Sequence, residues 1–271
     1  MSTETLQLAR DIRRLSLEMV TRARASHIAS ALSIADIVAV LYGSALRVFP
    51  GQPQAPARDR FILSKGHACV AVYAALACKG FIPHEQLLTY GQDHSQLMNH
   101  ISHKVPGVEF STGSLGHGLP FAVGKAVAAQ RLGADWRVAV VLSDGEMDEG
   151  SNWEALMFAA HHRLDNLVAF IDYNKLQSLT TVAATLGLEP LADKLGAFGC
   201  WVREVDGHDH GALLQAWEDA RTQRGKPAVV IAHTVKGKGV SFMENQVAWH
   251  YRSPDAQLLR QALSELEPPH A

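Results

Sequence analysis

The sequence predicts an α/β fold, a doubly wound and mainly parallel sheet with helices on both faces. Apolar runs of strand length alternate along the chain with longer segments whose apolar residues recur at helical spacing. The clearest case is one βαβ unit, with strands over 138–142 and 167–171 and a helix between them whose apolar residues run from Trp153 to Leu164. Apolar residues make up 47% of the 271 residues and charged residues 19%, which is typical of a globular protein with a sizeable core.

The first elements of the chain are predicted to be helical. Residues 4–25 should form a helix because apolar residues recur at helical spacing from Leu8 to Met19. A second helix is predicted over 34–46, after a segment of mostly small residues. Three prolines between positions 49 and 57 indicate a loop after it.

The next segment combines a buried strand with a long loop. A strand is predicted over 60–64, and the turn at 65–67 leads from it into a helix that ends near Gly80. Residues 92–113 carry several histidines and little periodicity, so we expect a long loop there. Loops of that length in compact domains are usually functional or disordered.

Strands and helices continue to alternate after the central unit. We expect a polar loop at 180–184, a short helix at 191–198, a strand at 201–205, a helix at 207–221, a strand at 228–235 and a C-terminal helix near 256–266. This alternation favours a parallel sheet. We expect residues 1–271 to form a single domain, with a C-terminal tail from about residue 240.

Polar residues follow both strands of the central unit. Asp144 and Gly145 come directly after the first strand, and Asn174 follows the second, thirty positions after Asp144. Both would lie at the carboxyl edge of the sheet, where open α/β sheets bind ligands. Carboxylate and amide oxygens suit Mg²⁺ or Ca²⁺, and magnesium often completes its shell with substrate phosphates. The helix that begins near Ser151 offers its positive end to an anion, so the pattern predicts a magnesium diphosphate site.

The stretch 143–177 resembles the thiamine diphosphate fingerprint, an Asp-Gly pair followed after about thirty residues by Asn. Its surroundings, with the segments RDRFILSKGH at 58–67 and STGSLGHG at 111–118, resemble transketolases, particularly those split into two subunits. The resemblance extends from His27 to His250 and implies the thiamine diphosphate-binding fold. Two residues depart from the common pattern, Ser143 where many members have Gly and His117 where many have Gln.

The resemblance implies a role for each matching residue. Asp144, Asn174 and the backbone carbonyl of Leu176 would hold Mg²⁺ or Ca²⁺. The cofactor would be contacted by His67, Gly113, Leu115, Gly145, Glu146, Asn174 and His250. His27, His100 and His250 would assist proton transfer at the substrate, for which histidine suits because its pKa lies near neutrality. Glu149 and Glu154 would lie at a subunit boundary and link two active sites.

A partner is implied by the same resemblance. Transketolases use a glutamate on a second, pyrimidine-binding domain, and we expect no segment after Glu267 to supply that domain. We therefore expect the chain to be the diphosphate-binding subunit of a two-subunit transketolase that transfers a two-carbon ketol unit from a ketose to an aldose. It would be active only with a C-terminal transketolase subunit, in an α₂β₂ assembly acting on sugars or sugar phosphates in carbohydrate metabolism.

Composition excludes some other classes of partner. A formal net charge of −2 gives no electrostatic case for nucleic acid or an acidic membrane surface. We see no apolar run near the roughly 18 residues that a membrane span requires. Three cysteines show neither metal spacing nor a disulfide framework, so we expect a cytoplasmic protein.

Three alternative functions stay open. The chain could be a subunit of another thiamine diphosphate enzyme, such as the α subunit of a 2-oxo acid dehydrogenase or an acetyl-transferring relative. It could be a non-catalytic cofactor-binding subunit. It could also be a metal-dependent hydrolase with zinc on His94, His100 and His103, although their spacing is irregular.

Overall fold

A single parallel sheet organises the computed structural model, which describes residues 3–267. Its five strands lie in the order β1-β2-β3-β5-β4, and every neighbouring pair is parallel. The strands are β1 (Arg60–Leu63), β2 (Val138–Ser143), β3 (Leu167–Tyr173), β4 (Trp201–Asp206) and β5 (Ala228–His233). The predicted fold class is therefore confirmed.

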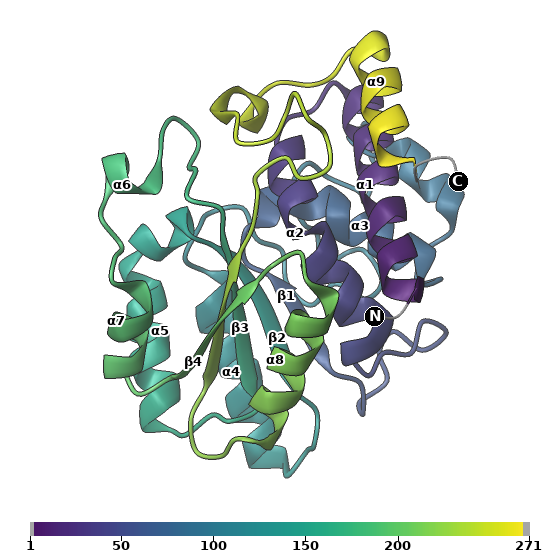
Figure 1. Cartoon of the computed structure of the whole chain (residues 1–271). Coiled ribbons are helices and arrows are strands. Elements are labelled where there is room, and N and C mark those ends of the chain that lie inside the picture. The colour runs from purple at the N-terminus through teal and green to yellow at the C-terminus, as the bar shows by residue number, and fades with distance from the viewer. Residues whose placement is uncertain (1–2, 268–271) are drawn as a thin grey trace.

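Helices cover both faces of this sheet (Figure 1). On one side lie α1 (Thr3–Ala23), α2 (Ile28–Val40), α3 (Cys69–Cys78), α8 (His210–Thr222) and α9 (Ala256–Leu266), and on the other α4 (Gly118–Leu132), α5 (Gly150–His161) and α7 (Leu191–Ala197). Each layer has its own apolar core, and the two cores meet only through the sheet. The molecule is therefore a three-layer sandwich around the central strands.

Strand β2 shows why the sequences of the central strands are unbroken runs of apolar residues. Successive side chains on a strand point to opposite faces. Val138 and Val140 pack toward α4 and α5, whereas Ala139 and Val141 pack toward the layer of α2 and α3. Since both faces are covered by helices, all six residues of the strand are buried.

Two helices differ from the sequence prediction. Helix α2 begins at Ile28, where a start at 34 was expected, and it ends at Val40 before a π-helical turn at Leu41–Ala45. All thirteen residues of α2 are buried, so it lacks the polar face that periodicity detects. Helix α4 was not predicted, and it too has a large share of small residues and a weak apolar stripe.

The segment Ile28–Ala45 is long and apolar enough, by composition, to cross a membrane, which corrects the sequence estimate. In the structure 83% of this segment is buried inside the fold. Its apolar character is therefore accounted for by its place among α1, α3 and α8.

The remaining predicted elements lie close to their expected places. The central βαβ unit, the strand after residue 59, the loop at 49–57 and the helix at 256–266 are confirmed. The polar loop expected at 180–184 contains the short helix α6 (Val182–Thr185). The predicted single domain includes residues 1–2 and 268–271, which lie outside the described residues. The chain after residue 240 returns to pack α9 on α1.

Candidate functional site

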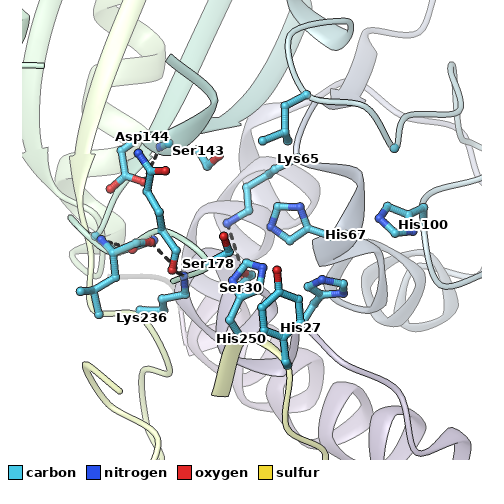
Figure 2. Close-up of a pocket in the computed structure, with 17 residues that line it drawn as sticks. His27, Ser30, Lys65, His67, His100, Ser143, Asp144, Ser178, Lys236 and His250 are labelled. Atoms are coloured by element: carbon cyan, nitrogen blue, oxygen red, sulfur yellow. Dashed lines mark hydrogen bonds between the residues drawn. The ribbon is translucent and has the colours of Figure 1, made fainter. Parts of the chain in front are cut away.

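A cavity of about 260 Å³ opens at the carboxyl edge of the sheet, beyond the ends of β1, β2 and β3. Figure 2 shows its two ends, with Asp144 and Lys236 on one side and His100 on the other. Its lining residues are His27, Ser30, Lys65, His67, His100, Gly113, Leu115, Ser143, Asp144, Gly145, Asn174, Leu176, Gln177, Ser178, Lys236, His250 and Tyr251. Ten of these seventeen residues had been predicted as site residues from the sequence; Glu146, Glu149 and Glu154 lie elsewhere.

Asp144 and Asn174 meet at one end of this cavity. The Asp144 carboxylate accepts hydrogen bonds from the backbone N–H groups of Gly145 at 2.7 Å and Lys175 at 2.5 Å. Lys175 has a φ of +66°, and this tight turn directs its N–H group toward Asp144. Burial, and after it the charge of Asp172, raises the pKa of Asp144 to about 7. A cation beside this carboxylate would offset both effects.

Asp172 lies beneath this end of the cavity and orients Asn174. It is fully buried and accepts hydrogen bonds from Ser33 Oγ at 2.6 Å and Asn174 Nδ2 at 3.1 Å, and from the hydroxyl of Thr234. Because the Asn174 amide nitrogen is turned toward Asp172, its oxygen is the atom left for a ligand. That oxygen also accepts the Leu176 N–H group at 3.1 Å.

The charge of Asp172 is balanced by Lys65, whose ammonium lies 2.6 Å from its carboxylate with both side chains almost completely buried. We expect Lys65→Met to lower the free energy of unfolding by about 3–5 kcal/mol, because it leaves an unpaired buried charge. Urea unfolding of the cofactor-free chain measures this loss. The double variant with Asp172→Asn should recover most of it. A loss below about 1 kcal/mol in the single variant, as for a surface pair, would contradict this account.

Four histidines that are distant in sequence form one cluster at the other end of the cavity (Figure 2). The ring of His27 lies 5.1 Å from that of His67, 4.9 Å from that of His250 and 5.8 Å from that of His100, centroid to centroid. The backbone N–H group of His27 also donates to the His250 carbonyl at 2.8 Å. His27 has a φ of +73°, an uncommon conformation for a residue other than glycine.

These histidines are neutral near pH 7. Burial, and after it His100 and the cations Lys236 and Lys65, lowers the pKa of His27 to about 4. Burial and Lys236 lower the pKa of His250 to about 3. The pKa values of His67 and His100 are also lowered, in both cases chiefly by burial. The buried Nδ1 of His250 has no hydrogen-bond partner among the described residues.

The segment around Thr112 passes close under the turn that carries His67. A Cβ on Gly66 would lie 2.4 Å from the Thr112 carbonyl oxygen, so only glycine permits this approach. Thr112 Oγ1 donates to the Leu63 carbonyl at 2.7 Å. Next to this contact, Gly113 and Leu115 lie in the wall of the cavity.

Glu146 does not line the cavity, although its contact with the cofactor was predicted. Its side chain is fully buried below the cavity, where it accepts hydrogen bonds from Ser64 Oγ at 2.5 Å and the Gly116 N–H group at 2.9 Å. It thereby joins the ends of β1 and β2 to the start of α4. Its side chain supports the wall of the cavity from outside.

Seven residues that line the cavity had not been predicted as site residues, among them Ser30, Lys65, Lys236 and Tyr251. Lys65 lies in the segment RDRFILSKGH, and Lys236 begins Lys-Gly-Lys-Gly at 236–239, so both positions carried a usable signal. Lys236 is 2% exposed, and its ammonium donates to the carbonyls of Leu176 at 2.8 Å and Gln177 at 3.0 Å. Its pKa is lowered to about 8 by burial and by Lys65.

Glu149 and Glu154 lie outside the cavity, and both are exposed. Glu154 lines a separate, largely apolar groove of about 710 Å³ between α4 and α5, together with His117 and Phe158. His117, which departs from the common transketolase pattern, therefore belongs to this groove and does not line the cavity. An exposed apolar groove of this kind is a candidate protein interface.

The zinc alternative finds no support in the described part of the chain. Residues 3–267 contain no group of three His, Cys, Asp or Glu side chains that could hold a metal ion. The oxygens of Asp144 and Asn174 and the Leu176 carbonyl are a different type of donor set, one that suits a hard cation with water or phosphate in its remaining positions.

Comparison with known proteins gives one consistent answer. Residues 5–265 match the family model "Transketolase, thiamine diphosphate binding domain". The chain is 41% identical to an apulose-4-phosphate transketolase subunit of Phocaeicola vulgatus, over 98% of this chain and 95% of that protein. It is also 41% identical to the 6-deoxy-6-sulfo-D-fructose transketolase subunit SqwG of Clostridium sp. (strain MSTE9), over 94% of each.

Solved structures agree with these matches. The transketolase from Leishmania mexicana superposes with a TM-score of 0.93 at 28% identity, covering 98% of this chain and 42% of that one. The transketolase from Campylobacter jejuni gives 0.92 at 30% identity, covering 98% and 43%. The chain thus spans about two fifths of the length of these solved transketolases.

Proposed function

Since this chain belongs to the transketolase family, we propose that it is the diphosphate-binding subunit of a two-subunit transketolase. The assembled enzyme transfers a two-carbon ketol unit from a ketose to an aldose with thiamine diphosphate. The observation that carries this proposal is the continuous cavity that joins the Asp144 and Asn174 end to the histidine cluster.

The Asp144 end of the cavity fits a magnesium diphosphate. Asp144 is 1% exposed, accepts only backbone N–H groups, and forms no ion pair with any described side chain. A divalent cation would supply the missing positive charge, held by Asp144, the Asn174 oxygen and the Leu176 carbonyl. The Lys236 ammonium, which here donates to the Leu176 carbonyl, would turn from that oxygen to the diphosphate when the cation takes its place. Gly145 would let the backbone approach the diphosphate closely.

The histidine end of the cavity fits the reacting part of the cofactor and a hydroxylated substrate. When bound, thiamine diphosphate supplies a nucleophilic thiazolium carbon and an electron sink for cleaving the bond beside a ketose carbonyl. His67 and His250 lie nearest the diphosphate end and hold the cofactor. His27 and His100 donate to or accept from substrate hydroxyls and move protons there, and their neutral state lets them do either.

The cavity is incomplete without a partner subunit. Asp144 is the only carboxylate among the seventeen described residues that line it, and in this proposal it holds the metal. We propose that the glutamate that transketolases place against the aminopyrimidine comes from a C-terminal transketolase subunit with the pyrimidine-binding domain. The P. vulgatus and Clostridium relatives are themselves named as subunits.

An α₂β₂ assembly in the cytoplasm is the arrangement that we propose. The groove between α4 and α5, with Glu154 inside it and Phe158 exposed beside it, offers the surface for a contact between subunits. Glu149 and Glu154 would then link two sites across the boundary. The ketose and aldose are sugars or sugar phosphates, and the partner subunit selects between them.

Protonation of the histidine cluster should destabilise the fold. The pKa of His250 is about 3 in the folded state, below its value of 6.5 for a free side chain, so the unfolded chain binds the proton more tightly. We expect the free energy of unfolding to fall as the pH drops from about 6.5 toward 4. The fall should be shallower in His250→Asn and unchanged in His84→Asn, a control at an exposed position. Urea unfolding across this pH range measures it, and parallel curves for His250→Asn and the wild type would refute it.

The proposed function is tested by purifying the tagged chain from its native cell with any stoichiometric partner. Ketol transfer from a ketose donor to an aldose acceptor is then assayed with thiamine diphosphate and magnesium. We expect a partner that contains a pyrimidine-binding domain, and activity that requires both chains. A stoichiometric partner without this domain, or binding of the cofactor without turnover in the assembly, would favour a non-catalytic or different thiamine enzyme.

A further inference from the structure

Asp36 lies in α2 outside the cavity, yet its contacts lead to the loop that carries Lys236. It is 6% exposed and bonds to three side chains from two other segments of the chain. The guanidinium of Arg13 donates to both of its oxygens, at 3.1 and 2.5 Å. His208 Nδ1 lies 2.6 Å from one oxygen, and His210 Nε2 lies 3.0 Å from the other. Burial alone would raise the pKa of Asp36, but these partners hold it well below its usual range.

Two of these partners, His208 and Arg13, also form hydrogen bonds with the backbone of the loop at 235–238. His208 Nε2 accepts the backbone N–H group of Val235 at 2.8 Å, and Arg13 Nε donates to the carbonyl of Lys238 at 3.1 Å. Val235 and Lys238 flank the Lys236-Gly237 pair. One carboxylate therefore orients the two side chains that hold both ends of this short loop.

The hydrogen bonds determine the tautomer of His208. Val235 can only donate through its backbone N–H group, so His208 Nε2 must be unprotonated to accept it. The proton of the neutral ring is then on Nδ1, where it is donated to Asp36. Asp36 thus selects the one ring form that can hold Val235, as a carboxylate does for a histidine that binds a metal.

The backbone of the loop at 235–238 restricts the position of Lys236. Gly237 has a φ of +84°, and a Cβ at this position would lie 2.4 Å from the Met243 carbonyl oxygen. The Gly237 N–H group donates to the Ala29 carbonyl at 3.0 Å, which ties the loop to α2. The Lys236 ammonium reaches from this loop to the Asp144 end of the cavity (Figure 2).

We propose that Asp36 is a positioning residue that acts through His208 and Arg13 to fix the Lys236 loop, and so places the Lys236 ammonium where the cofactor diphosphate binds. The role of the ammonium rests on the proposed function. We call Asp36 with Arg13 and His208 the clamp. The clamp does not rest on the proposed function, because all its hydrogen bonds lie within this chain.

His208 and His210 provide a matched pair of variants. Each donates one hydrogen bond to Asp36, but only His208 contacts the loop, whereas His210 Nδ1 contacts the Thr5 hydroxyl at 2.9 Å. The first measurement is amide hydrogen exchange over residues 234–239 in the chain without cofactor. We expect exchange at Val235 to become at least about tenfold faster in His208→Leu and to stay unchanged in His210→Leu.

The second measurement is titration of each variant with thiamine diphosphate at saturating magnesium. We expect His208→Leu to weaken binding about tenfold, a size typical of a residue that orients another. His208→Gln should restore both exchange and affinity, because its amide can donate to Asp36 and accept from Val235. If His208→Leu does not fold, His208→Asn replaces it, since the shorter amide cannot span both groups.

The outcomes separate the clamp from the proposed function. Unchanged exchange at Val235 in His208→Leu, or equal changes in the His208 and His210 variants, would overturn the clamp. Faster exchange with unchanged cofactor affinity would show that the loop does not place Lys236 against the diphosphate, and would also overturn the proposal. Failure of the wild-type chain to bind thiamine diphosphate with magnesium would instead count against the proposed function.

Discussion

Asp144→Ala is expected to abolish the magnesium dependence of thiamine diphosphate binding and to weaken binding by at least about 100-fold. Removing a residue that only supports a metal ligand typically costs about 10- to 100-fold, and Asp144 would be the single charged ligand. The variant also removes a buried carboxylate whose pKa is raised to about 7, so the fold should be retained. Calorimetric titration with thiamine diphosphate, with and without magnesium, measures the effect.

Asp148→Asn is the control for this variant. Asp148 lies four residues further along and bonds Gln177 Nε2 at 2.8 Å, but it does not line the cavity. Its replacement should leave the magnesium dependence intact. If Asp144→Ala binds the cofactor with the same magnesium dependence as the wild type, the assignment of the metal end of the cavity is wrong.

The second large effect is expected from the partner. The purified chain should show no ketol transfer with thiamine diphosphate and magnesium, and adding the C-terminal subunit should raise the rate at least about a thousandfold, within the range that one positioned proton-transfer group contributes. The physical reason is the absence of a glutamate among the described residues that line the cavity. Release of the shortened aldose from the ketose donor is the measured quantity.

Two controls make this result specific. The Asp144→Ala chain mixed with the same partner should stay inactive, because it lacks the proposed metal ligand although we expect it still to assemble. The partner alone should also be inactive, because the diphosphate end of the site lies on this chain. Ketol transfer at the full rate by the purified chain without a partner would refute the two-subunit proposal.

Much of the fold follows from local patterns. The strands β2 and β3 and the helix between them were predictable because an apolar run of strand length and a helical repeat are each contained in a few neighbouring residues. Helices α2 and α4 were placed wrongly or missed for the opposite reason. They are built largely from small and apolar residues, and a helix without a clear polar face shows no repeat.

One part of the candidate site could likewise be predicted from local sequence patterns, and another part could not. Asp144 and Asn174 could be brought together from sequence, because parallel neighbouring strands end at one edge. The histidines at positions 27, 67, 100 and 250 were expected from family resemblance, but no local pattern predicts that four segments so far apart meet within about 6 Å.

The sequence by itself determined the class of this protein: a parallel α/β sheet, a fingerprint at its carboxyl edge, and a family that binds thiamine diphosphate. Only the tertiary structure decided which side chains support that edge. Lys65 balances Asp172, Glu146 joins the ends of β1 and β2, and Asp36 orients the two side chains that bond to the Lys236 loop. The reason is physical. Hydrogen bonds and ion pairs between distant segments form only where the packed core brings those segments together, and the local periodicity of the sequence does not predict which segments meet.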